Sequence, residues 1–154
     1  MRVGLISDTH GLLRPQALEA LRGSDHIVHA GDIGKDGSIL QQLRSIAPVT
    51  AVRGNNDAGD WAASLREAET IVIGGIRIHV VHDLKELAID LHAQDIHVVV
   101  SGHSHKPLVE RRGGVLYVNP GSAGPRRFKL PVSVAQLLID GDGRLSVRIE
   151  EHDF

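Results

Sequence analysis

Five short apolar segments of this chain each run into a polar loop that carries aspartate, asparagine or histidine. The segments are residues 3–7, 26–30, 49–53, 77–81 and 97–100. Apolar runs of this length, bounded by turn-forming residues, are typical of buried β-strands. Ligands of open α/β sheets gather beyond the carboxyl ends of the strands, so we expect the polar groups at these five ends to converge.

The spacing of apolar residues also indicates what lies between the strands. Apolar residues three and four apart predict four helices, at about 15–21, 38–43, 61–66 and 84–91. Gly-Gly at 74–75 and 113–114 and Gly-Asp-Gly at 141–143 predict three hairpin turns. Strands that alternate with helices at first, and form hairpins later, predict an α/β fold with helices packed on one or more mixed sheets.

Length and composition limit the class of protein. A chain of 154 residues fits a single domain spanning residues 1–154. The sequence contains no cysteine, which excludes thiol nucleophiles and thiolate zinc sites, and its net charge of -2 favours neither nucleic acid nor a membrane surface as partner. No apolar stretch reaches the roughly 18 residues of a membrane span, and the N-terminal one is too short for a signal peptide. We therefore expect a soluble, cytoplasmic protein.

The polar groups at the strand ends have the chemistry of a metal centre. They are Asp8, His10, Asp32, Asn55, His82, His103 and His105. Two carboxylates, one amide and four imidazoles suit divalent ions of borderline hardness, namely Mn²⁺, Fe²⁺, Zn²⁺, Co²⁺ or Ni²⁺. Seven ligands are too many for one tetrahedral site but are natural for two ions that share a bridging carboxylate. Side chains two residues apart in an extended chain point the same way, which would aim both members of each Asp-x-His or His-x-His pair inward.

Each motif taken alone also has an ordinary structural interpretation. An Asp-x-His pair is commonly a surface pair, Gly31-Asp32 is a common turn, and residues 54–57 could form a loop or a helix cap. Their joint occurrence, each at the end of a predicted strand, favours the metal centre. The other histidines have no partner at ligand spacing, and His29 is interpreted as a core or supporting group.

In this order and spacing, the motifs resemble the signature of the calcineurin-like metallophosphoesterases. They are Asp8-x-His10, Gly31-Asp32, Gly54-Asn55-x-Asp57, His82 and Gly102-His103-x-His105. The downstream sequence is similar to the small YfcE-like phosphodiesterase branch of that family in its motifs Asn119-Pro120-Gly121-Ser122 and Pro125-Arg126. The resemblance implies a four-layer α/β/β/α sandwich, in which two mixed sheets are flanked by helices and two metal ions lie at the strand ends.

The resemblance also divides the ligands between two metal sites that share Asp32 as a bridge. One ion would be held by Asp8, His10, Asp32 and His105, and the other by Asp32, Asn55, His82 and His103. Two such ions, with Mn²⁺ as the first expectation, would activate a bridging hydroxide for in-line attack on phosphorus without a covalent enzyme intermediate. The expected activity is hydrolysis of a small phosphoester, and a phosphodiester before others.

Asn56 is a departure from the family pattern. Many relatives carry histidine at this position of the Gly-Asn-x-Asp motif, where it can protonate the leaving oxygen. Asparagine cannot supply a proton, and loss of a general acid typically costs about 10²–10⁴-fold in rate. We therefore predict a preference for leaving groups that need little protonation, such as those of aryl phosphodiesters. Asn56 would contact a phosphate oxygen, Arg126 would contact the substrate, and Asp57 is interpreted as a structural cap.

Two other functions are open on the same scaffold. The enzyme could be a phosphomonoesterase or nucleotide pyrophosphatase, or the chain could be a protein-interaction scaffold like the retromer subunit that resembles this branch. Competent residues at all seven ligand positions favour catalysis over a scaffold. The predicted partner is a small phosphoester, and the exposed hairpins permit a homo-oligomer.

Overall fold

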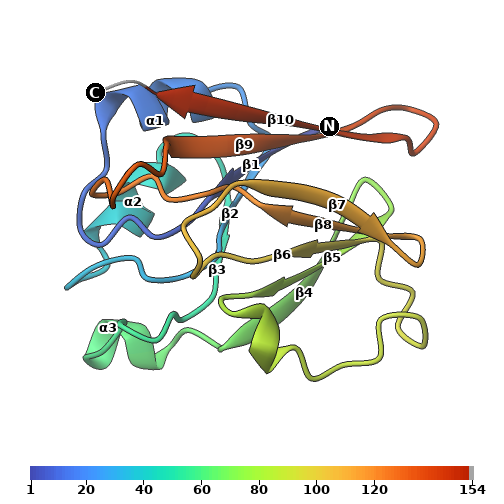
Figure 1. Cartoon of the computed structure of the whole chain (residues 1–154), viewed down its shortest axis with the longest axis horizontal. Coiled ribbons are helices and arrows are strands. Elements are labelled where there is room, and N and C mark those ends of the chain that lie inside the picture. The colour runs from blue at the N-terminus through green and yellow to red at the C-terminus, as the bar shows by residue number, and fades with distance from the viewer. Residues whose placement is uncertain (153–154) are drawn as a thin grey trace.

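Two five-stranded sheets pack face to face in the computed structural model, which describes residues 1–152 (Figure 1). The first sheet has the order β10-β9-β1-β2-β3, formed by Leu145–His152, Val132–Ile139, Arg2–Ile6, His26–His29 and Val49–Ala51. The second has the order β4-β5-β6-β8-β7, formed by Ala68–Ile73, Ile76–Val81, Val98–Val100, Val115–Asn119 and Leu108–Arg112. Both sheets are mixed, because β1, β2 and β3 are parallel, as are β5, β6 and β8, while the other neighbours are antiparallel.

Alternate side chains of the strands fill the space between the two sheets. Val3 and Leu5 of β1 belong to this interior together with Ile78 and Val80 of β5, whereas Ile6 packs on the opposite side of its sheet. This alternation is the period-two geometry of a strand. Because both faces of the central strands are covered, their sequences read as nearly continuous apolar runs. The same runs were the basis for predicting the strands.

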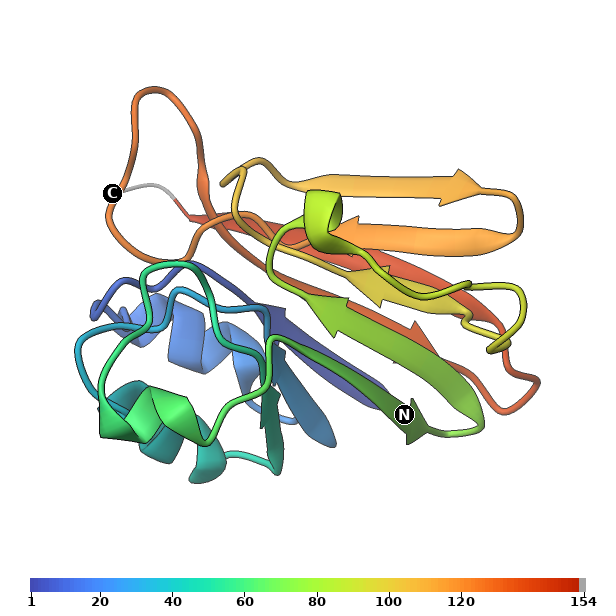
Figure 2. The same ribbon diagram turned by 90° about the horizontal axis from the view of Figure 1, so that it is seen from below.

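Two further layers cover the outer faces of the sheets. Helices α1 (Pro15–Leu21), α2 (Ser38–Arg44) and the short α3 (Asp60–Ala63) lie on the side of the first sheet that faces away from the second (Figure 2). The outer face of the second sheet is covered by segment 84–96, whose leucines pack against Val81 and Val99. Within residues 1–152, none of the helices has the length and apolar character that a membrane crossing requires.

The helix predicted over residues 84–91 is wrong. Only a single 3₁₀ turn, η1 (Leu84–Glu86), forms there. At its start the Asp83 carboxylate accepts a hydrogen bond from the backbone N–H of Lys85 at 3.1 Å. Asp90 begins a separate turn by accepting from the backbone N–H of His92, also at 3.1 Å. The leucines therefore have helical spacing because they cover a sheet, while two aspartate side chains compete with helical hydrogen bonding.

The other predicted elements are present, with some ends shifted. The hairpin turns at 74–75, 113–114 and 141–143 are confirmed by the antiparallel strand pairs on either side of them. The third helix covers only Asp60–Ala63, because the Ser64 hydroxyl bonds back to a carbonyl of that helix at 3.0 Å. The third strand ends at Ala51, since the N–H of Arg53 donates to the carbonyl of Arg66 in a different segment.

Candidate metal centre

The predicted ligands lie in the loops that follow five strands, three in the first sheet and two in the second. In chain order, the ligands after β1, β2, β3, β5 and β6 are Asp8 with His10, Asp32, Asn55, His82, and His103 with His105. The parallel strands of each sheet end at the same edge, and the two edges lie beside each other (Figure 1). The convergence expected from strand ends is therefore present in the fold.

Two carboxylates stand at the middle of the cluster and face three imidazoles. The Oδ1 atom of Asp8 lies 3.7 Å from Nε2 of His10, 3.9 Å from Nε2 of His82 and 3.4 Å from Nε2 of His105. The Oδ2 atom of Asp32 lies 3.3 Å from Nε2 of His82 and 3.8 Å from Nε2 of His10. Both carboxylates are almost completely buried.

These residues fit divalent cations. Oδ1 of Asp8 and the Nε2 atoms of His10 and His82 are buried and have no hydrogen-bond partner among the described residues. An unpaired buried polar group is costly, and a cation bonded to several such atoms at about 2.0–2.2 Å would offset that cost. Two overlapping groups have ligand atoms within 4.8 Å of one another, namely Asp8 with His10 and His105, and Asp8 with Asp32 and His82.

The ring of His82 is oriented from behind by the backbone of the first sheet. Its Nδ1 donates to the carbonyl of Ala30 at 2.7 Å, so Nε2 faces the two carboxylates. A metal-binding histidine usually donates its second ring N–H to such a carbonyl, which sets the tautomer and the direction of the lone pair. His82 is therefore held in the orientation that a metal ligand needs.

Burial and neighbouring charges shift the pKa values of three predicted ligands, Asp8, Asp32 and His82. Burial raises the pKa of Asp8, but the facing His10 and His105 rings and the Ser7 hydroxyl outweigh it and hold that pKa far below its usual range. Burial also opposes ionisation of Asp32, yet its interaction with His82 is among those that lower its pKa to about 2. For His82, burial lowers the pKa and the interaction with Asp32 outweighs it, raising the pKa to about 9. Both carboxylates are thus ionised near neutrality, and a cation would have to displace a proton from His82.

The two remaining predicted ligands, Asn55 and His103, lie at the rim of the cluster. His103 has a side chain that is 46% exposed, with its Nε2 3.7 Å from Oδ2 of Asp83. Its ring meets that of His82 edge to face, with centroids 5.3 Å apart. Asn55 lines a cavity of about 330 Å³ together with His82 and His103. These two residues therefore neighbour the His82 side of the cluster.

Five of the predicted ligands have left-handed backbone, a feature that the sequence did not predict. Their φ angles are 55° for Asp8, 46° for His10, 55° for Asp32, 71° for His103 and 63° for His105. Such angles are uncommon outside glycine and persist only where surrounding contacts enforce them. Here the N–H of Asp8 donates to the carbonyl of Gly31 at 3.0 Å, and the N–H of His10 donates to that of Asp32 at 2.9 Å. The extended geometry expected for the Asp8-x-His10 and His103-x-His105 pairs is wrong. The side chains of Asp8, His10 and His105 converge, whereas that of His103 lies at the exposed rim.

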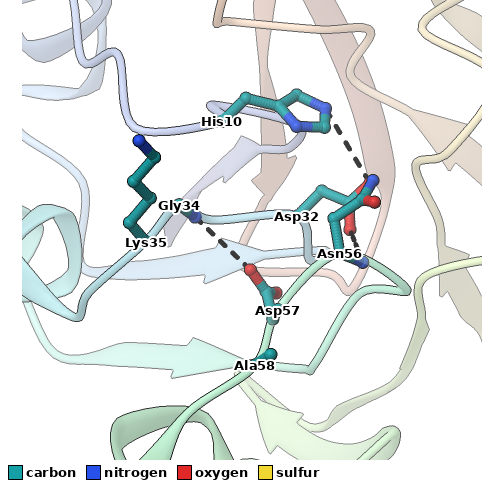
Figure 3. A pocket seen from close by; sticks show the side chains of 7 residues that line it. All are labelled: His10, Asp32, Gly34, Lys35, Asn56, Asp57 and Ala58. Carbon is teal, nitrogen blue, oxygen red and sulfur yellow. Dashed lines mark hydrogen bonds and ion pairs between the residues drawn. The ribbon is translucent and has the colours of Figure 1, made fainter.

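Asn56 and Asp57, in the loop after β3, form hydrogen bonds that support the loop of Asp32 (Figure 3). The backbone N–H of Asn56 donates to Oδ1 of Asp32 at 2.9 Å, and its Nδ2 donates to Oδ2 at 3.0 Å. Asp57 accepts from the backbone N–H groups of Ile33 at 2.8 Å and of Gly54 at 2.9 Å. The structural interpretation of Asp57 is thus confirmed. The predicted contact between Asn56 and phosphate stays a prediction, because its amide is bonded to Asp32 here.

A buried chain of hydrogen bonds joins the Asp8 loop to the Asp32 loop through His29. The N–H of Gly31 donates to Nδ1 of His29 at 3.1 Å, so Nε2 of the neutral ring carries the hydrogen and donates to Oγ1 of Thr9 at 3.0 Å. The Thr9 hydroxyl then donates to the carbonyl of Ile33 at 2.7 Å. Thr9 lies between two predicted ligands, and residues 31 and 33 flank Asp32. The interpretation of His29 as a core residue that supports the site agrees with this arrangement.

Replacing Thr9 by valine should weaken both the fold and the metal site. Valine keeps the shape of threonine but leaves the buried His29 N–H unpaired, at roughly 1–3 kcal/mol of unfolding free energy. The Ile33 carbonyl loses one of its two hydrogen bonds and keeps the one from the backbone N–H of Gly11 at 2.8 Å. Outer groups that orient ligands are typically worth about 10–100-fold in metal affinity. Denaturant unfolding and calorimetric titration with Mn²⁺ would measure the two effects. Thr9→Ser should retain both properties, and a Thr9→Val protein equal to wild type would rule out the role of the chain.

The buried ring of His29 should make the fold less stable in mild acid. Burial is the largest cause that lowers its pKa, from 6.5 to about 4. Between pH 6.5 and pH 4 the unfolded chain binds a proton at His29 more readily than the folded chain does. The unfolding free energy is therefore unaffected by protonation of His29 above pH 6.5 and falls by roughly 3 kcal/mol as the pH decreases to 4. Unfolding free energies measured across this range should fall less steeply in His29→Gln than in wild type. The matched change at the exposed His92 should leave the slope unchanged, and equal slopes in all three proteins would contradict the assignment.

The segment that begins at Asn119 ties several ligand loops together. Nδ2 of Asn119 donates to the carbonyl of Gly102 at 3.0 Å, and the Ser122 hydroxyl donates to the carbonyl of Asp8 at 3.0 Å. The chain then continues into the exposed residues 125–129, which include Arg126 and Arg127. The Asn-Pro-Gly-Ser motif is therefore structural, and a substrate contact by Arg126 stays a prediction.

The fold and the strand-end cluster define a two-sheet α/β protein with carboxylates and imidazoles grouped as candidate metal ligands. A family model described as the calcineurin-like phosphoesterase superfamily domain matches residues 1–142. The chain belongs to this superfamily, as its motifs predicted.

Curated relatives support the same family. A probable metallophosphoesterase of Methanothermobacter thermautotrophicus is 33% identical over 157 residues, covering 92% of this chain and 88% of the relative. The phosphodiesterase YfcE of Escherichia coli K12 is 26% identical, covering 89% of this chain and 87% of that protein.

Solved structures share the fold over almost the whole chain. The structure of Escherichia coli YfcE, a phosphoesterase, has a TM-score of 0.69 and 26% identity, covering 94% of this chain and 96% of that one. Vps29 of Entamoeba histolytica in complex with Zn²⁺ has a TM-score of 0.75 and 24% identity, covering 98% and 99%. The likeness to Vps29 shows the fold alone.

Proposed function

We propose that the chain is a phosphodiesterase that uses two divalent metal ions, with Mn²⁺ as the first expectation. Asp8, His10, Asp32 and His105 would hold one ion, while Asp32, Asn55, His82 and His103 would hold the other. The observation that carries the proposal is the unpaired, buried Oδ1 of Asp8 with three imidazole nitrogens 3.4–3.9 Å away. A buried carboxylate oxygen that accepts no hydrogen bond from the described residues is suited to a cation.

The chain's own groups would orient the site before a substrate arrives. Two bound ions would supply an activated water and neutralise charge on the phosphoryl oxygens. The Asn56 amide and N–H hold both oxygens of Asp32, which fixes the direction of that carboxylate. The Ala30 carbonyl fixes the ring of His82. Rigid support of this kind favours catalysis because ligands need no reorganisation during the reaction.

Metal-dependent turnover is the test of this proposal. The protein would be loaded separately with Mn²⁺, Zn²⁺, Co²⁺ and Ni²⁺ and assayed with bis(4-nitrophenyl) phosphate and with 4-nitrophenyl phosphate. Faster metal-dependent cleavage of the diester is expected. Cleavage of the monoester alone would favour a phosphomonoesterase, and no metal-dependent cleavage of either would refute an enzymatic function.

The absence of a proton donor at Asn56 gives a separate prediction. Asn56→His should raise kcat/KM for a dialkyl phosphodiester at least about tenfold relative to bis(4-nitrophenyl) phosphate, because only the alkyl leaving group needs a proton. The histidine also removes the amide bond to Asp32, so Asn56→Ala is the matched control and should lower both rates alike. An unchanged ratio of the two substrates in Asn56→His would count against the argument.

A protein-interaction scaffold is the second candidate function. The observation in its favour is the fold shared with Vps29, one structure of which holds a cyclic peptide, at 18% identity and a TM-score of 0.69. The complete set of ligand residues in this chain favours catalysis. The two functions differ in the assay above, since a scaffold would bind a metal without turning over either ester.

A further inference from the structure

A cavity of about 410 Å³ opens beside the predicted metal centre and continues away from it (Figure 3). His10, Asp32 and Asn56 form the wall nearest the centre. Gly34, Ala58 and Lys35 contribute to the rest of the lining, and Figure 3 shows Lys35 across the cavity from the Asp32 side chain. A phosphodiester has two ester arms, so one arm has room here when its phosphorus lies at the ligands.

Lys35 is the only lysine or arginine among the residues that line this cavity. Its neighbour Asp36 uses a carboxylate oxygen to accept from the N–H of Ser38 at 2.9 Å. Asp57 is occupied by backbone N–H groups, including that of Gly34 at 3.3 Å. Among residues 1–152, Lys35 makes no ion pair. A positive charge is therefore available to a ligand in the cavity.

The backbone of Lys35 is held in place although its side chain is exposed. The indole N–H of Trp61 donates to the Lys35 carbonyl at 2.9 Å. The backbone of Gly34 packs directly on the backbone of Gly11. A Cβ atom added to Gly34 would lie only 2.8 Å from the nitrogen and the Cα of Gly11. The ammonium group thus extends from a fixed point on the cavity wall. The backbone of Lys35 therefore need not be ordered when an anion binds, and the entropy lost is that of the side chain alone.

We infer that Lys35 forms a second anion subsite, so the preferred substrate is a phosphodiester whose second ester arm ends in a negatively charged group. This inference rests on the proposed function. The scissile phosphate would lie at the metal ligands, the arm that is not cleaved would pass Gly34 and Ala58, and its anionic end would meet Lys35. One charge-assisted hydrogen bond to an exposed lysine corresponds to about tenfold in affinity.

The test compares two 4-nitrophenyl phosphodiesters whose second arm is phenyl in one and 4-carboxyphenyl in the other. In the Mn²⁺-loaded wild type, KM should be about tenfold lower for the carboxylate, with kcat nearly equal. Lys35→Gln should remove this difference and Lys35→Arg should keep it. Arg144→Gln, in the exposed turn between β9 and β10, is the control and should behave as wild type.

Binding can also be measured without turnover. Trp61 is the single tryptophan of the chain and is bonded to Lys35, so its fluorescence should report binding of 4-carboxyphenyl phosphate more strongly than that of phenyl phosphate. Lys35→Gln should make the two titrations alike.

The possible failures are distinct. If wild type cleaves neither ester, the proposed function fails. If it cleaves both with equal KM, or if Lys35→Gln keeps the preference for the carboxylate, only the inference about Lys35 is wrong.

Discussion

Asp32→Asn should reduce metal-dependent phosphodiester hydrolysis by about 10³-fold or more. The Oδ2 atom of Asp32 lies between His10 and His82, and the carboxylate is the expected bridge between the two ions. An amide at this position removes a negative charge and places either a poorer oxygen ligand or an N–H group against the cation. Metal-derived stabilisation of the transition state amounts to several kcal/mol, and each 1.4 kcal/mol corresponds to about a factor of ten. The measurement is kcat/KM for bis(4-nitrophenyl) phosphate at saturating Mn²⁺.

A neighbouring aspartate gives a close control for this substitution. Asp36 lies four residues away in the same loop, is exposed, and only caps the backbone N–H of Ser38. Asp36→Asn should retain activity within about twofold, since surface changes away from special features have small effects. His105→Ala should behave like Asp32→Asn because its Nε2 faces Asp8 at 3.4 Å. Near-normal rates in both ligand variants would show that the metal site has been misassigned.

Gly54→Ala should damage the site without removing any ligand. A Cβ atom at Gly54 would overlap the backbone nitrogen and Oδ1 of Asp32, neither of which can move aside like the end of a flexible side chain. The two loops would have to separate, and a displacement of about 1 Å can cost about 10²-fold in rate. Overpacking of this kind also destabilises proteins by roughly 1–3 kcal/mol. We expect a loss of about 10²-fold in kcat/KM and a lower Tm.

The matched control for this change is Gly141→Ala. A Cβ atom at Gly141 would meet nothing within 4 Å, and its backbone is not left-handed, so alanine should be tolerated there. Thermal unfolding and kcat/KM measured on both variants would separate the steric effect from the general effect of replacing glycine. A Gly54→Ala protein with wild-type rate and Tm would mean that the loops of Gly54 and Asp32 are further apart than described.

The sequence was most informative where burial shapes the pattern of residues. Strands covered on both faces are apolar throughout, and hairpin turns need glycine, so both could be predicted. The leucines of segment 84–96 follow the same burial rule, yet they cover the second sheet without forming a helix. Periodicity reports which side chains are buried. It does not report that Asp83 and Asp90 will direct the backbone into turns.

The sequence could predict which residues gather at the candidate site. It could not predict the hydrogen bonds and close contacts that hold their loops in place. Residue types and strand ends were enough to predict that Asp8, His10, Asp32, His82 and His105 converge. The Thr9 and His29 chain and the contact of Gly54 with Asp32 depend on how two loops approach in space. No local pattern encodes that approach, and the lysine of the adjoining cavity carries no motif at all.

The left-handed ligand residues imply a trade-off between stability and activity. Each such residue is held at roughly 1–3 kcal/mol above a relaxed conformation, and backbone hydrogen bonds between loops help to maintain it at Asp8 and His10. Replacing His10, His103 or His105 by glycine would relieve this backbone strain but would remove an imidazole from the predicted metal site. On the proposed function, a descendant no longer selected for turnover would gain stability by losing these histidines while keeping the same fold.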